Sequence, residues 1–180
     1  MRISFFLLIF ILVIPLMAQE NEKLSWAENR VLSWDDFKAS PKKHLPYKAN
    51  TNSGLSFSWN ATQSNQGIEL NYEVGSNFYP NRSWVKEIEE VDYLLAHEQL
   101  HFDITELHAR KLRKALSNYE PAASKIKKEL NALYAEIEKQ HRKMQTEFDK
   151  ESNHSLNKEA ELKWRIFVQE ELEQLSAYSS

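Results

Sequence analysis

Two stretches in the first half of the chain alternate between hydrophobic and polar residues. Residues 55–60 alternate Leu, Phe and Trp with Ser and Asn, and residues 68–74 alternate Ile, Leu, Tyr and Val with Glu and Asn. A period of two is typical of a strand that buries one face. The polar segment 62–67 between them predicts a hairpin loop. Together with a further short strand expected at residues 30–34, they predict a small antiparallel sheet.

The second half of the chain changes to a helical period. Its apolar residues recur every three or four positions, and it contains one proline, Pro121, and no glycine. This spacing predicts amphipathic helices. We expect the first helix to run from Ser83 or Trp84 to Tyr119, with Ser83 as its cap, and the second to begin at Pro121. A polar break at residues 149–157 then separates the second helix from a third.

An apolar segment at the N-terminus is typical of a secretory signal. Arg2 is followed by an apolar run at residues 3–17, and Ala18 ends that run before a polar segment. The run is shorter than the roughly 20 residues that a membrane span needs. We therefore predict a signal peptide at residues 1–18, with an uncleaved anchor as the alternative. Residues 19–180 are expected to form a single domain that is secreted or periplasmic, without stable membrane insertion after cleavage.

The expected domain is α+β. A small N-terminal antiparallel sheet, in residues 28–80, packs on a long helix that is followed by two further helices, in residues 83–175. The chain has 180 residues, 42% of them hydrophobic, which suits one packed core. It has no cysteine, which excludes disulfides, thiol nucleophiles and iron–sulfur clusters. The net charge of −3 provides no basic surface for nucleic acid. Any metal ion must therefore be held by histidine and carboxylate side chains.

Residues 97–101 carry the strongest chemical signal in the sequence. His97 and His101 are one helical turn apart, so they share a helix face and lie about 6 Å apart along the axis. Two imidazoles at this spacing can bind one ion, and Glu98 can face a water molecule on it. This His-Glu-x-x-His pattern is typical of zinc metallopeptidases, in which the glutamate is the general base. Apolar residues surround the motif, and burying its polar groups without partners would cost several kcal/mol.

A catalytic zinc site normally takes a third protein ligand. His154 in the polar break and His141 on the apolar face of the second helix are both candidates, and the residues alone leave the choice open. Asp103 or Asp149 can orient a ligand imidazole by accepting its other N–H. His108 lies too far along the first helix to reach the same ion.

Four segments of the chain resemble one bacterial family. They are residues 31–37, 49–57, 83–86 together with 97–104, and 148–155 with Trp164 beyond. On these segments the chain is similar to the predicted secreted zinc-dependent proteases, which are largely a domain of unknown function. The resemblance implies a zincin-like fold, bound Zn²⁺, peptidase activity, and His154 rather than His141 as the third ligand. Phe148 stands where the family usually has tyrosine.

We therefore predict a secreted zinc-dependent hydrolase, most simply a peptidase. His97, His101 and His154 would bind Zn²⁺, and Glu98 would take a proton from the metal-bound water. The substrate would be a peptide or protein, aligned by main-chain hydrogen bonds to one of the two hairpin strands. Two alternatives remain. One is a cell-wall peptide hydrolase, and the other is an exported helical binding or structural module in which the ion only stabilises the fold.

Overall fold

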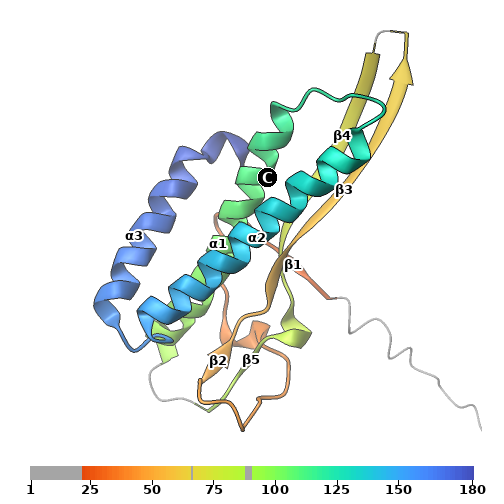
Figure 1. Ribbon diagram of the computed structural model, residues 1–180. Coiled ribbons are helices and arrows are strands. Elements are labelled where there is room, and N and C mark those ends of the chain that lie inside the picture. Colours follow the sequence, from red (N-terminus) through yellow and green to blue (C-terminus); the bar gives the residue numbers. More distant parts are fainter. Residues whose placement is uncertain (1–21, 66, 88–90) are drawn as a thin grey trace, which may run out of the picture.

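The computed structural model describes residues 22–65, 67–87 and 91–180 (Figure 1). Their fold is α+β, with a small antiparallel sheet followed by three helices, which confirms the predicted class. The predicted signal peptide at residues 1–18 lies outside the described residues. Within the described part, no helix has both the length and the apolar character needed to cross a bilayer.

A long hairpin forms most of the sheet. Strands β3 (Ser53–Ser64) and β4 (Gly67–Phe78) pair along their whole length, and the short strand β1 (Leu24–Ser25) pairs with the other side of β4. Both strands predicted from alternation are confirmed, and both are longer than expected. Alternate residues of β3, Leu55, Phe57 and Trp59, form the face that packs against the helices. The tip of the hairpin extends past the helices in Figure 1.

A second, two-stranded sheet corrects the predicted start of the first helix. Strand β2 (Ala49–Asn50) pairs with strand β5 (Trp84–Val85), so the residues expected to begin a helix form a strand. The Ser83 hydroxyl accepts the Asn52 backbone N–H at 2.9 Å and donates to the Tyr79 carbonyl at 3.0 Å. The Ser83 hydroxyl therefore binds residues that flank β3 and β4, and it does not cap the helix.

Three helices make up the rest of the fold. They are α1 (Val91–Ser117), α2 (Ile126–Ser152) and α3 (Lys158–Gln174). The number of helices is as expected, but α2 begins after Pro121 rather than at it. It also continues into the predicted polar break. The break is therefore shorter than expected, and it ends at Asn157, whose side chain accepts a backbone N–H in the first turn of α3.

The predicted strand at residues 30–34 is wrong. Trp34–Asp36 form a 3-10 turn, in which the Asp36 carboxylate accepts the Ser33 backbone N–H at 2.8 Å and the Ser33 hydroxyl at 3.1 Å. This local capping arrangement competes with strand pairing for the same backbone groups. Further 3-10 turns lie at Pro80–Arg82 and Ser176–Tyr178.

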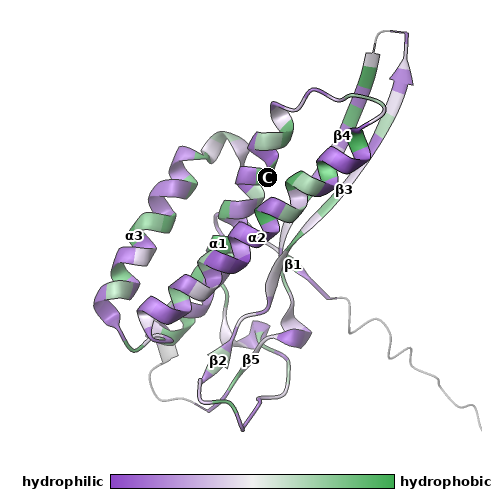
Figure 2. Cartoon of the chain, viewed as in Figure 1, coloured by the Kyte–Doolittle hydropathy of each residue, from purple (hydrophilic) through white to green (hydrophobic). Residues whose placement is uncertain are grey.

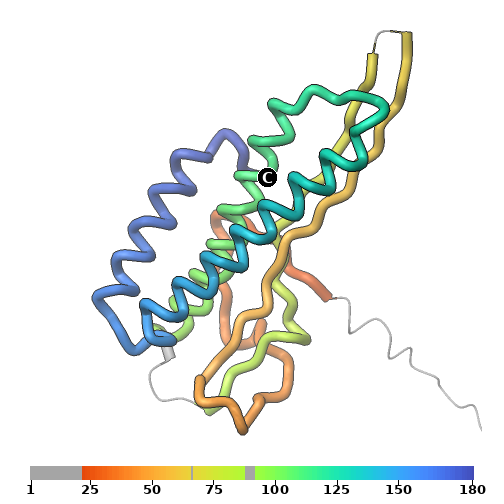
Figure 3. The backbone as a smooth tube through the Cα atoms, in the orientation of Figure 1, coloured from red at the N-terminus to blue at the C-terminus, as the bar shows by residue number. Residues whose placement is uncertain are grey.

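Helix α1 lies at the centre of the core. It contacts the hairpin as well as α2 and α3, and the paths of the three helices can be followed in Figures 1 and 3. Figure 2 shows hydrophobic and hydrophilic residues alternating in bands along the helices, as expected for amphipathic elements. Phe102, Ile104, Leu107 and Leu112 of α1 are all 1% exposed or less. The histidine motif therefore lies on a helix that is buried on most sides.

Candidate metal centre

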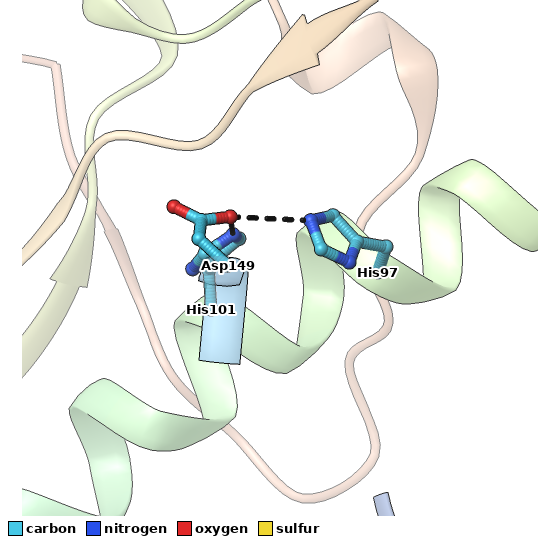
Figure 4. Close-up of side chains that lie close together, drawn as sticks. All are labelled: His97, His101 and Asp149. Atoms are coloured by element: carbon cyan, nitrogen blue, oxygen red, sulfur yellow. Dashed lines mark ion pairs between the residues drawn. The ribbon is translucent and has the colours of Figure 1, made fainter. Parts of the chain in front are cut away.

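Two imidazoles and one carboxylate meet where α1 packs on the end of α2 (Figure 4). His97 and His101 project from α1, and Asp149 belongs to the last turn of α2. The Nε2 atoms of His97 and His101 lie 3.6 and 3.2 Å from the same oxygen, Asp149 Oδ1. One donor atom from each residue lies within 4.8 Å of the other two. The three side chains are thus close enough to bind a single cation.

Both imidazoles are held by a hydrogen bond on their other nitrogen. Nδ1 of His97 is 2.9 Å from Glu161 Oε2, and Nδ1 of His101 is 2.5 Å from Gln145 Oε1. Carboxylate and amide oxygens only accept, so each Nδ1 is the donor. The donation fixes the orientation of each ring, and it directs Nε2 toward Asp149 and the centre of the cluster.

The residues that hold the imidazoles are themselves fixed. Glu161 is 1% exposed, and its second oxygen accepts a hydrogen bond from Arg165 at 2.8 Å. The Gln145 amide nitrogen donates to the His101 carbonyl at 2.8 Å and to His141 Nε2 at 3.0 Å. These bonds set which way the Gln145 amide faces, and its oxygen is therefore directed at the His101 ring.

The Asp149 carboxylate and the His97 imidazole shift each other's pKa values. Burial lowers the pKa of His97, but hydrogen bonds to Asp149 and Glu161 outweigh burial and raise it to about 9. Burial also acts to raise the pKa of Asp149, yet hydrogen bonds from His101 and His97 hold it well below its ordinary value. Asp149 is therefore ionised at neutral pH and able to bind a cation, whereas His97 must first lose a proton.

Glu98 lies beside the cluster with an unused carboxylate oxygen. The residue is 3% exposed, and its Oε2 has no hydrogen-bond partner among the described residues. A buried carboxylate oxygen without a partner is costly. Glu98 lines the same cavity as His97 and His101, so a molecule bound in that cavity can supply the missing hydrogen bond.

A cavity of about 770 Å³ opens next to the cluster. Residues 46–53 form one wall, residues of α1 and α2 form others, and residues 153–156 complete the lining. This volume lies within the range of pockets that bind small molecules. The cluster therefore faces a space that an external molecule can enter.

His154 lies next to the cluster but outside the group of three residues. Its Nδ1 is 3.3 Å from Asp149 Oδ1, its side chain is 49% exposed, and its ring packs on Tyr47 with the ring centroids 5.2 Å apart. Asn153, His154 and Ser155 have φ values of 48°, 51° and 73°, which are uncommon for residues other than glycine. His154 as a ligand stays a prediction, while Asp149 already offers a donor within the cluster.

His141 is occupied by other contacts. It is 5% exposed, and its Nε2 is 3.0 Å from both Thr105 Oγ1 and Gln145 Nε2. Burial lowers its pKa to about 3, so the ring is neutral. His141 belongs to the hydrogen-bond network that orients Gln145 rather than to the cluster.

Of the two carboxylates that the sequence suggested for orienting an imidazole, Asp149 contacts the histidines and Asp103 does not. Asp103 does not orient a ligand imidazole, because its Oδ1 accepts the Trp26 indole N–H at 2.8 Å on another side of α1. Gln145 and Glu161 take that role. Gln145 and Asp149 are one turn apart on α2, and recognising that the helix continues to this point would have placed both on one face. Glu161 carries no local signal, since it comes from a different helix.

A family model described as "Bacterial protein of unknown function (DUF922)" matches residues 28–155, well over half of the chain. The chain belongs to this family. The comparisons with curated proteins and with solved structures gave no match. The matched segment includes His97, His101 and Asp149, whereas Glu161 lies beyond it on α3. The family description names no activity.

Proposed function

We propose that the protein is an exported, zinc-dependent hydrolase of peptide bonds with Glu98 as its general base. The observation that carries this proposal is the convergence of two imidazole nitrogens and an Asp149 oxygen beside the unpartnered oxygen of Glu98. The cavity next to these groups supports a reaction with an external molecule. Export rests on the apolar N-terminal segment of the sequence.

The donor set fits a divalent cation that accepts imidazole. His97, His101 and Asp149 would hold it through two nitrogens and one oxygen, a combination used by catalytic zinc. Glu161 and Gln145 would keep the two rings in place. When bound, such an ion makes water more acidic and polarises a carbonyl group. Three protein donors leave room at the ion for a reacting molecule.

Glu98 would carry out the proton transfers. Its unpartnered Oε2 can accept a proton from a water molecule in the cavity and then deliver that proton to the leaving amine. The Thr51 hydroxyl donates to the Glu98 carbonyl at 3.1 Å, which holds this part of α1 against the strand wall of the cavity. Glu98 therefore combines a fixed backbone with a carboxylate that is free to react.

The alternative is an exported binding or structural module in which an ion only stabilises the packing of α1 on α2. The 3.3 Å distance from His154 Nδ1 to Asp149 Oδ1 favours this alternative, because a fourth protein donor would close the coordination sphere. A closed site would leave no position for substrate, and Glu98 would then have no chemical role.

The substitution Glu98→Gln distinguishes the two functions. We expect the variant to bind one equivalent of Zn²⁺ and to hydrolyse casein at least about 100-fold more slowly than the wild type. Glu136→Gln changes an exposed glutamate on α2 and is the matched control, with the full rate expected. Zinc is measured by atomic absorption, and hydrolysis by release of labelled fragments. A wild-type rate in Glu98→Gln would refute Glu98 as the general base, whereas a zinc-loaded wild type without hydrolytic activity would favour the structural module.

A further inference from the structure

The strand segment that borders the cavity has one unpaired edge. The Lys48 carbonyl accepts the N–H of Lys86, just after β5, at 2.7 Å, and the Asn52 carbonyl accepts the N–H of Tyr79, just after β4, at 2.9 Å. Asn50 lies between them and pairs with Trp84 in the β2–β5 ladder. Backbone groups alternate along a strand, so the N–H and C=O groups of Ala49 and Thr51 point to the other side. Within the described part of the chain, no strand pairs with that side of β2.

Hydroxyl groups fix this segment on the helix that carries the histidines. The Thr51 hydroxyl donates to the Glu98 carbonyl at 3.1 Å, and the Ser53 hydroxyl lies 3.4 Å from the His101 carbonyl and 2.7 Å from Thr105 Oγ1. The two contacts are one turn apart on α1, so the segment runs along the motif. Its unpaired edge therefore lies beside the candidate metal centre.

The edge borders the cavity at residues 49–53 and is covered farther along. At Leu55 the outward carbonyl accepts the Tyr134 hydroxyl of α2 at 3.4 Å. Residues 49–53, in contrast, face the cavity of about 770 Å³, whose opposite wall includes Gln145 and Asp149 of α2. The cavity therefore lies between this strand edge and α2.

We infer that an extended polypeptide segment binds in this cavity as an added strand on the unpaired edge of residues 49–53. The inference rests on the proposed function and names its substrate class, an unfolded L-polypeptide. Main-chain hydrogen bonds to Ala49 and Thr51 hold the segment beside His97 and Glu98. The edge lies just before the hairpin strands that the sequence suggested for this role.

The geometry favours an L-polypeptide over a cell-wall peptide. An added strand places successive side chains on opposite faces, one toward α1 and one away from it. A D-residue, as found in cell-wall peptides, reverses this order and breaks the pairing. Main-chain binding also predicts little dependence on the sequence of the bound segment.

Binding is measured in the Glu98→Gln background with zinc present, so that the probe is not cleaved. The probe is fluorescein-labelled casein, an unfolded polypeptide, followed by fluorescence anisotropy. Thr51→Pro removes the outward N–H at a position where an edge strand tolerates proline. Its reference is Thr51→Val, which lacks the hydroxyl but keeps the N–H. We expect Thr51→Pro to bind casein about tenfold more weakly than this reference. Ala61→Pro, at the exposed end of the hairpin, should leave binding unchanged.

A second measurement does not depend on the folding of a proline variant. Successive amides of a short casein-derived peptide are N-methylated one at a time. Strand addition predicts that every second methyl group weakens binding and that the intervening ones do not. Absence of casein binding, equal sensitivity at all amides, or binding of a D-residue cell-wall peptide in preference to casein would overturn the inference.

The outcomes separate this inference from the proposed function. In one outcome the zinc-loaded wild type binds casein, with every second N-methyl group weakening the binding of the peptide, and yet fails to hydrolyse it. That result refutes the hydrolase and leaves strand addition standing. Hydrolysis of casein together with equal effects of N-methylation at all amides refutes strand addition and leaves the hydrolase standing.

Discussion

Replacing Glu161 tests whether α3 contributes to the candidate metal centre. The residue is 1% exposed, and its two oxygens lie 2.9 Å from His97 Nδ1 and 2.8 Å from an Arg165 nitrogen. Glu161→Ala removes the acceptor that holds the His97 ring. Loss of such a partner typically weakens metal binding about 10- to 100-fold, or about 1.4 to 2.8 kcal/mol. We expect the zinc affinity to fall by this amount at a pH at which His97 is deprotonated.

The same substitution has an opposing effect through proton competition. Burial lowers the pKa of His97, but Asp149 and Glu161 raise it to about 9. At pH 7, removing that proton costs about 2.7 kcal/mol of the binding free energy. The zinc affinity of the wild type should therefore rise between pH 7 and pH 9. Without Glu161 the pKa of His97 is lower, so the rise should be smaller and should end at a lower pH.

Competition with a fluorescent zinc chelator at pH 7, 8 and 9 measures both effects. Glu161→Gln keeps an acceptor oxygen and should lose less affinity than Glu161→Ala. The matched control is Glu159→Ala, which removes a carboxylate with an 81% exposed side chain from the same helix. Thermal unfolding confirms that each variant is folded. If Glu161→Ala binds zinc with the affinity and pH dependence of the wild type, His97 is not a ligand held by this contact, and the assignment of the centre is wrong.

Two further predictions concern the third donor and a buried histidine. Asp149→Ala should lower the zinc affinity by more than about 100-fold, because it removes a donor, and His154→Ala should lower it less than about tenfold. The opposite order in the chelator titration would support His154 as the third ligand. Burial lowers the pKa of His108 to about 4 from an ordinary value of 6.5, so between these pH values the unfolded chain binds a proton that the native protein does not. The free energy of unfolding should therefore decrease as the pH falls from 6.5 to 4, by up to about 3 kcal/mol. Urea titrations should show this decrease in the wild type and a weaker one in His108→Asn, and an equal decrease in both would contradict the reasoning.

Local spacing was enough to predict the hairpin and the two-histidine motif. Alternation at residues 55–60 and 68–74 determines which side chains share a strand face, and the spacing of His97 and His101 places both on one side of a helix. These relations depend on backbone geometry over a few residues. They therefore do not depend on contacts with distant parts of the chain. The α+β class and the three helices follow from them.

Local spacing was not enough where a segment gains a distant partner. The sequence predicted that Trp84–Val85 begin a helix, but these residues pair with Ala49–Asn50. Asp149 read as part of a polar break, but α2 continues through it because Phe148, which is 0% exposed, buries that turn against the histidine rings. Tertiary packing contributes more to the stability of a helix than the helix propensity of its residues does.

The groups that join the two histidines follow from the packing of separate helices. Asp149 and Gln145 come from α2 and Glu161 comes from α3. In the sequence Gln145 and Glu161 resemble ordinary polar residues of a helix surface, and Asp149 was a candidate only for orienting an imidazole. Periodicity indicates which face of a helix is buried, but the register between two packed helices depends on the side chains of both. For that physical reason one segment of sequence could reveal the pair of imidazoles and not the carboxylates that complete the centre.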